Sequence, residues 1–221
     1  MSLGEGKVTN VAVSVGIATG VYGISFGALS ITAGFDIWQT IALSALMFSG
    51  GSQFAFVAVG LSDLSTAITS AWLVGIRNGF YALSLASNLG PRGFHKVLAA
   101  QLTIDESTAV STSRQTLTEQ KKGFWLTGIS VFVFWNTATI LGAFLGQQIG
   151  DPKTFGLDAA AAAALFALVW PRIQKSVGAA IAATAILGSL IFSLVLPSGP
   201  PVLLGAGLAV LVGFWLERSR Q

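Results

Sequence analysis

The chain has little charge and almost no metal-binding chemistry: its 221 residues include no cysteine, one histidine, twelve Lys or Arg and nine Asp or Glu. Without cysteine, a disulfide-framed secreted module is excluded. One histidine and no cysteine also rule out a zinc site of the usual nitrogen and sulfur type, and no cofactor is expected. Charged residues make up 10% of the chain, against roughly 25% in an average soluble domain. A soluble globular protein and a nucleic-acid-binding protein are therefore excluded.

What the chain does have is apolar residues, which make up 53% of it and give a mean hydropathy of +0.74. A bilayer core needs about 20 apolar helical residues to be crossed, and the stretches between charges supply them. We therefore predict an all-α polytopic membrane helix bundle, with residues 1–221 as a single integral membrane domain. About seven transmembrane segments are expected, at 11–34, 38–60, 64–89, 123–149, 157–171, 176–196 and 202–216.

The positions of Lys and Arg predict how these segments are oriented. With seven crossings, nine of the twelve fall on one side, in the connection 90–122, near 172–175 and at the C-terminus, whereas Lys7 and Lys153 fall on the other. The C-terminus is therefore predicted to be cytoplasmic and the N-terminus extracytoplasmic, and the basic excess requires no anionic partner. Residues 97–110 contain two adjacent acidic residues, so a full crossing is not expected there. A re-entrant helix and an interfacial helix both remain open.

The order of the segments permits an inverted repeat, a symmetry of many transporters. Residues 11–89 would form one half and 123–196 the other, with 202–216 as a last helix. The second segment of each half is interrupted or short, at 48–54 and at 157–171. Backbone leaves helical pairing at membrane depth only where protein or a water-filled cavity satisfies it, so such breaks indicate a binding site. The alternative is a packing contact at the first break and an ordinary interfacial stop at the second.

Five stretches of the chain resemble, in matching order, the AzlC family of large subunits of branched-chain amino-acid exporters. They are GISFGALSITAG (23–34), FSGGSQF (48–54), RNGFY (77–81), LTIDES (102–107) and the alanine-rich run 156–168. The family usually shows Asn-Arg-His where this chain reads Ile-Arg-Asn at 76–78, and Thr-Asp-Glu where it reads Thr-Ile-Asp-Glu at 103–106. These departures leave the substrate and the coupling ion open.

The resemblance implies a multi-pass protein of the cell membrane that exports leucine, isoleucine, valine and, by extension, methionine. It also implies an ion gradient as the driving force, exchange of substrate against that ion as in an antiporter, and a small four-span partner subunit similar to AzlD. An oligomer is compatible with it. No G-x-x-x-x-G-K-[ST] motif is present, so this chain is not expected to hydrolyse ATP.

Arg77 is the charge that lies near the centre of a predicted segment, where a charge costs at least about 2.5–3.5 kcal/mol. We expect it to face a cavity and to hold the carboxylate of an amino acid with two parallel hydrogen bonds. The alternative is a fixed ion pair with Asp105, Glu106 or Asp158, or the capping of helix carbonyl groups.

Three acidic residues are candidates for proton or ion coupling: Asp105, Glu106 and Asp158. A carboxyl group can exchange protons near neutral pH when burial or a neighbouring like charge raises its pKa. The alternative for Asp105 and Glu106 is that both solvate a cytoplasmic connection. For Asp158 the alternative is the N-cap of the alanine-rich helix that follows it.

The other candidates for substrate binding are uncharged residues at the first break or on other segments: Gly50, Gly51, Ser52, Gln53, Asn78 and Asn136. Side chains and free backbone groups at 50–53 would contact the amine and carboxylate of the substrate. The alternative there is glycine-mediated packing with a satisfied amide. For Asn136 the alternative is an ordinary hydrogen bond between membrane helices.

Two function classes remain from the sequence. The leading hypothesis is a secondary exporter of branched-chain amino acids, and its rival is an uncoupled channel or permease pore subunit for small amino acids or other small solutes. An enzyme is not expected, because the sequence has no Ser/His pair, paired catalytic carboxylates or metal-ligand set.

Overall fold

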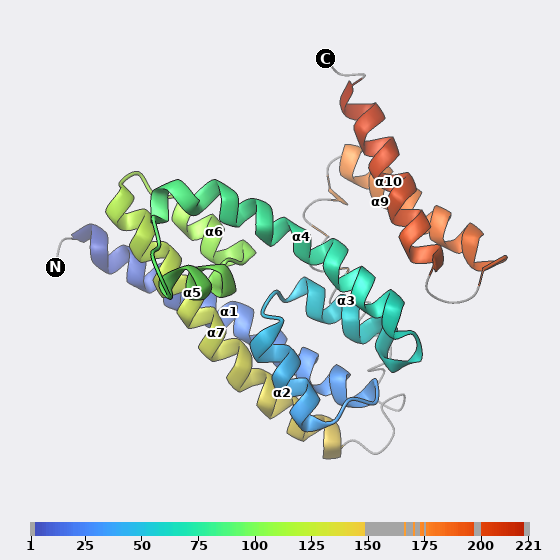
Figure 1. Ribbon diagram of the computed structural model, residues 1–221, viewed down its shortest axis with the longest axis horizontal. Coiled ribbons are helices and arrows are strands. Elements are labelled where there is room, and N and C mark those ends of the chain that lie inside the picture. Colours follow the sequence, from blue (N-terminus) through green and yellow to red (C-terminus); the bar gives the residue numbers. More distant parts are fainter. Residues whose placement is uncertain are drawn as a thin grey trace.

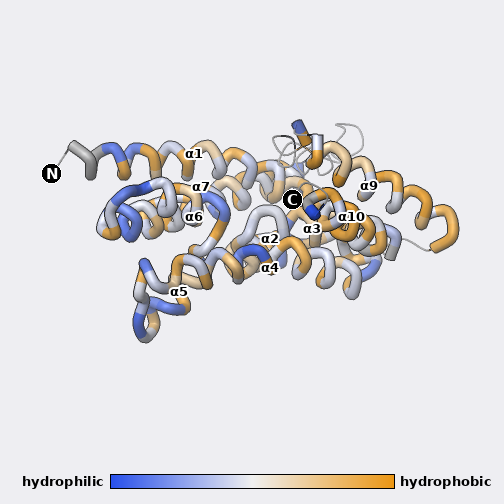
Figure 2. Tube along the Cα trace, turned by 90° about the horizontal axis from the view of Figure 1, so that it is seen from above, coloured by the Kyte–Doolittle hydropathy of each residue, from blue (hydrophilic) through white to orange (hydrophobic). Residues whose placement is uncertain are grey.

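The computed structural model describes residues 3–148, 176–196 and 200–218, together with the single positions 166, 170, 173 and 174. All regular elements in these residues are helices, which confirms the predicted all-α fold. Residues 7–32, 117–148 and 176–193 are long and apolar enough to cross a membrane. Figure 2 shows apolar residues along much of the helical length, with hydrophilic residues gathered near the N-terminus and around α5.

We call the helices of residues 3–148 the main bundle. Three long helices run its length: α1 (Leu3–Thr32), α4 (Leu64–Leu89) and α7 (Leu117–Gln148). α1 and α7 lie side by side and run in the same direction (Figure 1), with Gly16 against Ser130 and Gly20 against Phe134. Glycine is needed along this contact because a Cβ at Gly23 would lie 2.6 Å from the carbonyl oxygen of Trp135. Small residues thus allow the two backbones to approach closely, as in many membrane helix pairs.

α4 runs back in the opposite direction between two well-defined ends. Asp63 caps its start, accepting hydrogen bonds from the Thr66 hydroxyl (2.6 Å) and the Thr66 N–H (3.2 Å). The hydrogen bonds from the Thr66 and Ser65 side chains hold the pKa of the Asp63 carboxyl below its usual range. At the other end, Asn88 donates to the Gln120 side chain near the start of α7 (3.0 Å). α4 is therefore antiparallel to α7.

The segment after α1 forms a re-entrant hairpin, made of α2 (Ile37–Leu46) and α3 (Gly51–Val59). Asp36 and Gln39 form a capping box that starts α2. The break between the helices reaches the middle of α7, where Phe48 packs edge-on against Phe132 (ring centroids 5.0 Å). Gly60, just after α3, lies back beside Ala33 at the end of α1. We call this segment hairpin 1.

A second re-entrant hairpin enters from the opposite end and consists of α5 (His95–Leu102) and α6 (Asp105–Thr112). Its tip reaches Gly128 of α7, against which Leu102 packs. α6 then returns, and Ser111 donates to the backbone carbonyl of Gln120 (3.0 Å). The structure folds 97–110 into a hairpin whose tip packs against the middle of α7, which is the geometry expected of a re-entrant segment. We call this segment hairpin 2.

The predicted crossing at 38–60 is corrected by this arrangement, since hairpin 1 begins and ends at one end of the bundle. The break at 47–50 and the positive φ of Gly50 (+53°) turn the chain back instead of letting one helix continue. Because hairpin 1 does not cross the bundle, α1 and α7 run in the same direction. The register in which they pair places Lys7 at the same end of the bundle as Lys121 and Lys122. The expectation that Lys7 and the connection 90–122 lie on opposite sides is therefore wrong.

The ends of the bundle differ in charge. The end we call the basic end holds Lys7, Arg92, Lys96, Arg114, Lys121 and Lys122. The acidic end holds the two helix-capping residues Asp36 and Asp63. The expected inverted relation between 11–89 and 123–196 would make α1 and α7 antiparallel. In the structure these two helices run in parallel.

The C-terminal part of the described chain is a helical hairpin of α9 (Ser176–Ser193) and α10 (Pro200–Arg218). It matches the segments predicted at 176–196 and 202–216, and Gly188 packs against Gly205 where the helices cross. Apart from the single positions 166 and 170, the segment predicted at 157–171, with Asp158, lies outside the described residues.

Candidate functional site

A cavity of about 270 Å³ lies in the middle of the main bundle, where the tips of the two hairpins meet. Ligand pockets commonly measure about 300–1,000 Å³, so this one suits a small solute. Hairpin 1, hairpin 2 and all three long helices contribute to its wall. The lining residues are Thr19, Tyr22, Phe48, Ser49, Gly50, Gly51, Phe54, Arg77, Ile104, Asp105, Glu106, Val131 and Trp135.

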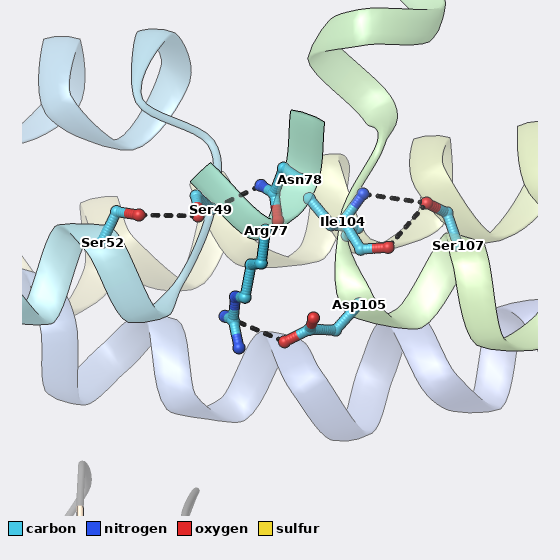
Figure 3. A network of polar contacts seen from close by, with 7 residues as sticks. All are labelled: Ser49, Ser52, Arg77, Asn78, Ile104, Asp105 and Ser107. Carbon is cyan, nitrogen blue, oxygen red and sulfur yellow. Dashed lines mark hydrogen bonds and ion pairs between the residues drawn. The ribbon is translucent and has the colours of Figure 1, made fainter. Parts of the chain in front are cut away.

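The charged part of the wall is an ion pair between Arg77, in the middle of α4, and Asp105, at the start of α6. Arg77 Nη2 lies 2.9 Å from Asp105 Oδ2, and the two side chains are 24% and 30% exposed. Figure 3 shows them pointing toward each other across the gap between α4 and hairpin 2. The ion pair that the sequence left as the alternative for Arg77 is thus formed, and it is formed in the cavity wall.

Asn78, the neighbour of Arg77, makes the corresponding contact with the other hairpin. Its side-chain amide donates to Ser49 Oγ (3.2 Å), and Ser49 Oγ lies 2.9 Å from Ser52 Oγ. Two successive residues of α4 therefore hold the tips of two different hairpins (Figure 3). A second hollow of about 420 Å³ lies on the far side of this contact, lined in part by Ser49, Ser52 and Gln101.

The carbonyl groups at the end of α2 accept hydrogen bonds from two glutamine side chains. Gln53 Nε2 donates to the carbonyls of Leu43 (3.0 Å) and Ser44 (3.1 Å). Gln101 Nε2, from hairpin 2, donates to the carbonyl of Ala45 (2.7 Å). A helix end buried without partners would be costly, so these amides explain how α2 can stop inside the bundle.

The starts of α3 and α6 both face the cavity. Gly50 and Gly51 line it at the start of α3, where the described residues supply no side-chain cap. Asp105 and Glu106 line it in the first turn of α6. Backbone N–H groups at a helix start attract negative charge, and the apolar side chains of Phe48, Phe54, Ile104 and Val131 occupy much of the remaining wall.

The structure brings together most of the residues that the sequence selects, and it separates others. Gly50, Gly51, Arg77, Asp105 and Glu106 all line the cavity. Ser52 and Asn78 lie just behind it, in the wall of the second hollow.

Two candidates take other positions. Gln53 is fully buried and caps α2 instead of lining the cavity. Asn136 donates to the Phe132 carbonyl of its own helix (2.8 Å) and is not in the cavity wall. Asp158 lies outside the described residues, so its role stays a prediction.

Sequence reasoning missed the residues that α1 and α7 contribute. Thr19 and Tyr22 come from the middle of α1, and Trp135 comes from the middle of α7. Trp135 is 3% exposed, stacks on Phe26 (centroids 6.1 Å) and meets Phe54 edge-on (6.2 Å). The available signal was a tryptophan in mid-segment, far from the membrane interface where this residue is usually enriched.

Comparison with known proteins places this architecture in a family. A family model described as "AzlC protein" matches residues 14–149, which include both hairpins and the cavity. The branched-chain amino acid transport protein AzlC of Bacillus subtilis is 24% identical over 196 residues, covering 86% of this chain and 75% of that protein. An uncharacterized membrane protein of Archaeoglobus fulgidus is 29% identical over 165 residues, covering 73% of each chain. No solved structure matches the chain.

Proposed function

The chain belongs to the AzlC family, and on that premise we propose that it is the large subunit of a secondary transporter that exports branched-chain amino acids. Leucine, isoleucine and valine are the expected substrates, with methionine as a further one. A relative is named a branched-chain amino acid transport protein. The observation that carries the proposal is the cavity with an arginine–carboxylate pair at the meeting point of two broken helices. Broken helices at mid-membrane are the usual binding sites of secondary transporters.

The cavity has a part suited to each end of a branched-chain amino acid. The substrate carboxylate would bind the Arg77 guanidinium and the N–H groups at the start of α3, beside Gly50 and Gly51. The substrate amine would bind the carboxylates of Asp105 and Glu106. The aliphatic side chain would contact the apolar wall formed by residues such as Phe48, Phe54, Ile104 and Val131. Ser52 and Asn78 would support the tip of hairpin 1 from behind.

Export requires a driving force, and we assign the coupling of export to proton movement to Glu106. Glu106 is half-buried in the cavity wall next to Asp105, and the ion pair with Arg77 involves Asp105. A carboxyl group that is removed from water and lies beside a like charge binds its proton more tightly. Inward proton movement through Glu106 would then drive amino-acid export as an antiport. Asp158 remains a second candidate for this role.

The charge of the two ends supports an orientation in the cell membrane. With hairpin 1 not crossing and 157–171 as a crossing, the chain crosses six times and both termini lie on one side. Ten of the twelve Lys and Arg then lie on that side, all but Arg77 and Lys153. The rule that basic residues face the cytoplasm places both termini inside. The proposed partner is a small four-span subunit similar to AzlD.

Counterflow in liposomes tests the proposal. The chain is reconstituted with and without the small subunit, the vesicles are preloaded with unlabelled leucine, and uptake of radiolabelled leucine, valine and methionine is followed. Leucine counterflow, together with leucine efflux that responds to an imposed pH gradient, supports a coupled exporter. Leucine equilibration that ignores both pH and sodium gradients supports the rival, an uncoupled channel or permease subunit. Absence of flux with the partner present contradicts both.

A further inference from the structure

The main bundle contains two copies of one structural unit, a long helix followed by a re-entrant hairpin. α1 runs from the basic to the acidic end, and hairpin 1 enters from the acidic end. α4 runs from the acidic to the basic end, and hairpin 2 enters from the basic end. The second unit is therefore inverted with respect to the first. Figure 1 shows the two units in sequence, in blue to cyan and in teal to green.

The sequence carries a trace of this relation. Gly23-Ile24-x-x-Gly27 in the last third of α1 matches Gly75-Ile76-x-x-Gly79 in the middle of α4. Ala-Leu-Ser follows the first motif at 28–30 and the second at 82–84. The tips then follow at similar spacing, at 47–50 in hairpin 1 and at 103–104 in hairpin 2.

We infer that residues 23–57 and 75–110 form an inverted repeat, and that the two hairpin tips are the two gates of the transport pathway. Hairpin 1 closes the cavity toward the acidic end, and hairpin 2 closes it toward the basic end. This inference rests on the proposed transport function, because gates have meaning only for a solute that crosses. Inverted repeats supply two related gating elements around one central site in many secondary transporters.

The contacts that hold the two tips differ, although the units are related. Hairpin 1 is held by Asn78 at Ser49 and by Gln101 at the end of α2. Hairpin 2 is held to α4 by the Arg77–Asp105 pair. Its tip is braced internally by Ser107, whose hydroxyl accepts from the Ile104 N–H (3.1 Å) and donates to the Leu102 carbonyl (2.6 Å).

This asymmetry gives the substrate a way to act on one gate. A substrate carboxylate that binds Arg77 competes with Asp105 for the same guanidinium, since both are anionic acceptors. Hairpin 2 then loses its contact with α4, while Asn78 of α4 still holds the tip of hairpin 1. A ligand shifts a conformational equilibrium only through such a difference in contacts between two states. Gln101 is thus a positioning residue, which joins hairpin 2 to hairpin 1 without lining the central cavity.

Cysteine labelling tests the assignment directly, because the natural chain has no cysteine. Thr19→Cys places a reporter thiol in the cavity wall on α1, outside both hairpins. Sealed vesicles of both orientations are labelled with a membrane-impermeant maleimide. Asp105→Asn, which weakens the hold on hairpin 2, is expected to raise labelling from the basic end by more than about threefold. Asn78→Leu, which releases the tip of hairpin 1 from α4, is expected to raise it by a similar factor from the acidic end.

The controls separate gating from unfolding and from substrate choice. Phe94→Cys at the basic end and Leu61→Cys at the acidic end replace exposed residues, and each is expected to label from its own side in every background. If the hairpin 1 and hairpin 2 variants raise labelling of the cavity thiol from the same end, or if none changes it, the gate assignment is overturned. Labelling requires no leucine. A failure of leucine to protect the cavity thiol therefore contradicts the proposed substrate and leaves the gates standing.

Discussion

Arg77 and Asp105 meet at 2.9 Å in the cavity wall although they lie on different elements, one in the middle of a long helix and one at the tip of a re-entrant hairpin. Neither is fully buried, with exposures of 24% and 30%. A fixed structural pair needs no access to a cavity, whereas a pair that opens for an anionic ligand does. Both residues line the cavity, so the pair is placed where a substrate carboxylate can compete for it.

The first prediction concerns this pair. Arg77→Ala is expected to lower leucine export at least about tenfold, because the substrate loses a charge-assisted contact. Arg77→Lys keeps the charge but loses the planar fork, and is expected to retain a reduced rate with a raised KM. Export and membrane level are measured together, with Arg92→Ala at the basic end as the matched control. Near-normal export by Arg77→Ala removes the arginine from the mechanism.

The second prediction concerns coupling. Glu106→Gln keeps the size of the side chain but removes its exchangeable proton. Leucine counterflow, which needs no net proton movement, is expected to persist, while leucine export driven by an acidic exterior is lost. The measurement compares both assays in the same vesicles across pH, with Glu119→Gln at the exposed start of α7 as the control. Unchanged gradient-driven export in Glu106→Gln assigns the proton to another group.

The third prediction separates two roles of Gln53. The sequence predicts a substrate contact, whereas the structure has its amide capping the end of α2. Gln53→Leu removes the side-chain donor to the carbonyl of Ser44, and is expected to lower stability by about 1–3 kcal/mol. The KM for leucine is expected to stay unchanged. A raised KM with an unchanged melting temperature restores the role predicted from the sequence.

The sequence predicted the polar content of the site better than its geometry. Scarcity of charge selected Arg77, Asp105 and Glu106, and the Gly-Gly pair marked the break in hairpin 1, because charge and broken helix are both costly at membrane depth. Whether hairpin 1 crosses the membrane could not be read from the same residues. Hydropathy reports how long an apolar stretch is, and it carries no information on whether the chain turns back halfway.

The residues missed by the sequence have the same physical explanation. Thr19, Tyr22 and Trp135 line the cavity only because α1 and α7 pack in parallel around the two tips. That packing depends on long-range contacts between helices about a hundred residues apart in the sequence. The Gly-x-x-x-Gly spacings indicated close helix crossings, but they did not identify the partner helix or its direction.

The fourth prediction is the side on which the N-terminus lies. With hairpin 1 re-entrant, Lys7 joins the basic end, and the positive-inside rule places that end in the cytoplasm. Green fluorescent protein fused before residue 1 is expected to fluoresce, and alkaline phosphatase fused after residue 62 is expected to be active outside the membrane. Alkaline phosphatase fused after residue 92 serves as the opposite control and is expected to be inactive. An extracytoplasmic N-terminus contradicts the re-entrant course of hairpin 1.

The fifth prediction uses the two matching glycine motifs of the inverted repeat. Gly23→Ala adds a Cβ that would lie 2.6 Å from the Trp135 carbonyl oxygen, so α1 and α7 must separate. Such overpacking is expected to cost about 1–3 kcal/mol of stability. Gly79→Ala changes the corresponding motif on α4, where a Cβ meets no atom of the chain within 4 Å. Its better helix propensity is expected to leave stability equal or slightly raised.

Thermal unfolding of the purified chain in detergent measures both variants under the same conditions. Equal losses of stability in the two variants would mean that Gly79 of α4 is packed as tightly as Gly23 of α1. A loss confined to Gly23→Ala means that the two units have the same helix motif but use it differently. On α1 the motif fixes the helix against α7, whereas on α4 its second glycine, Gly79, meets no other part of the described chain.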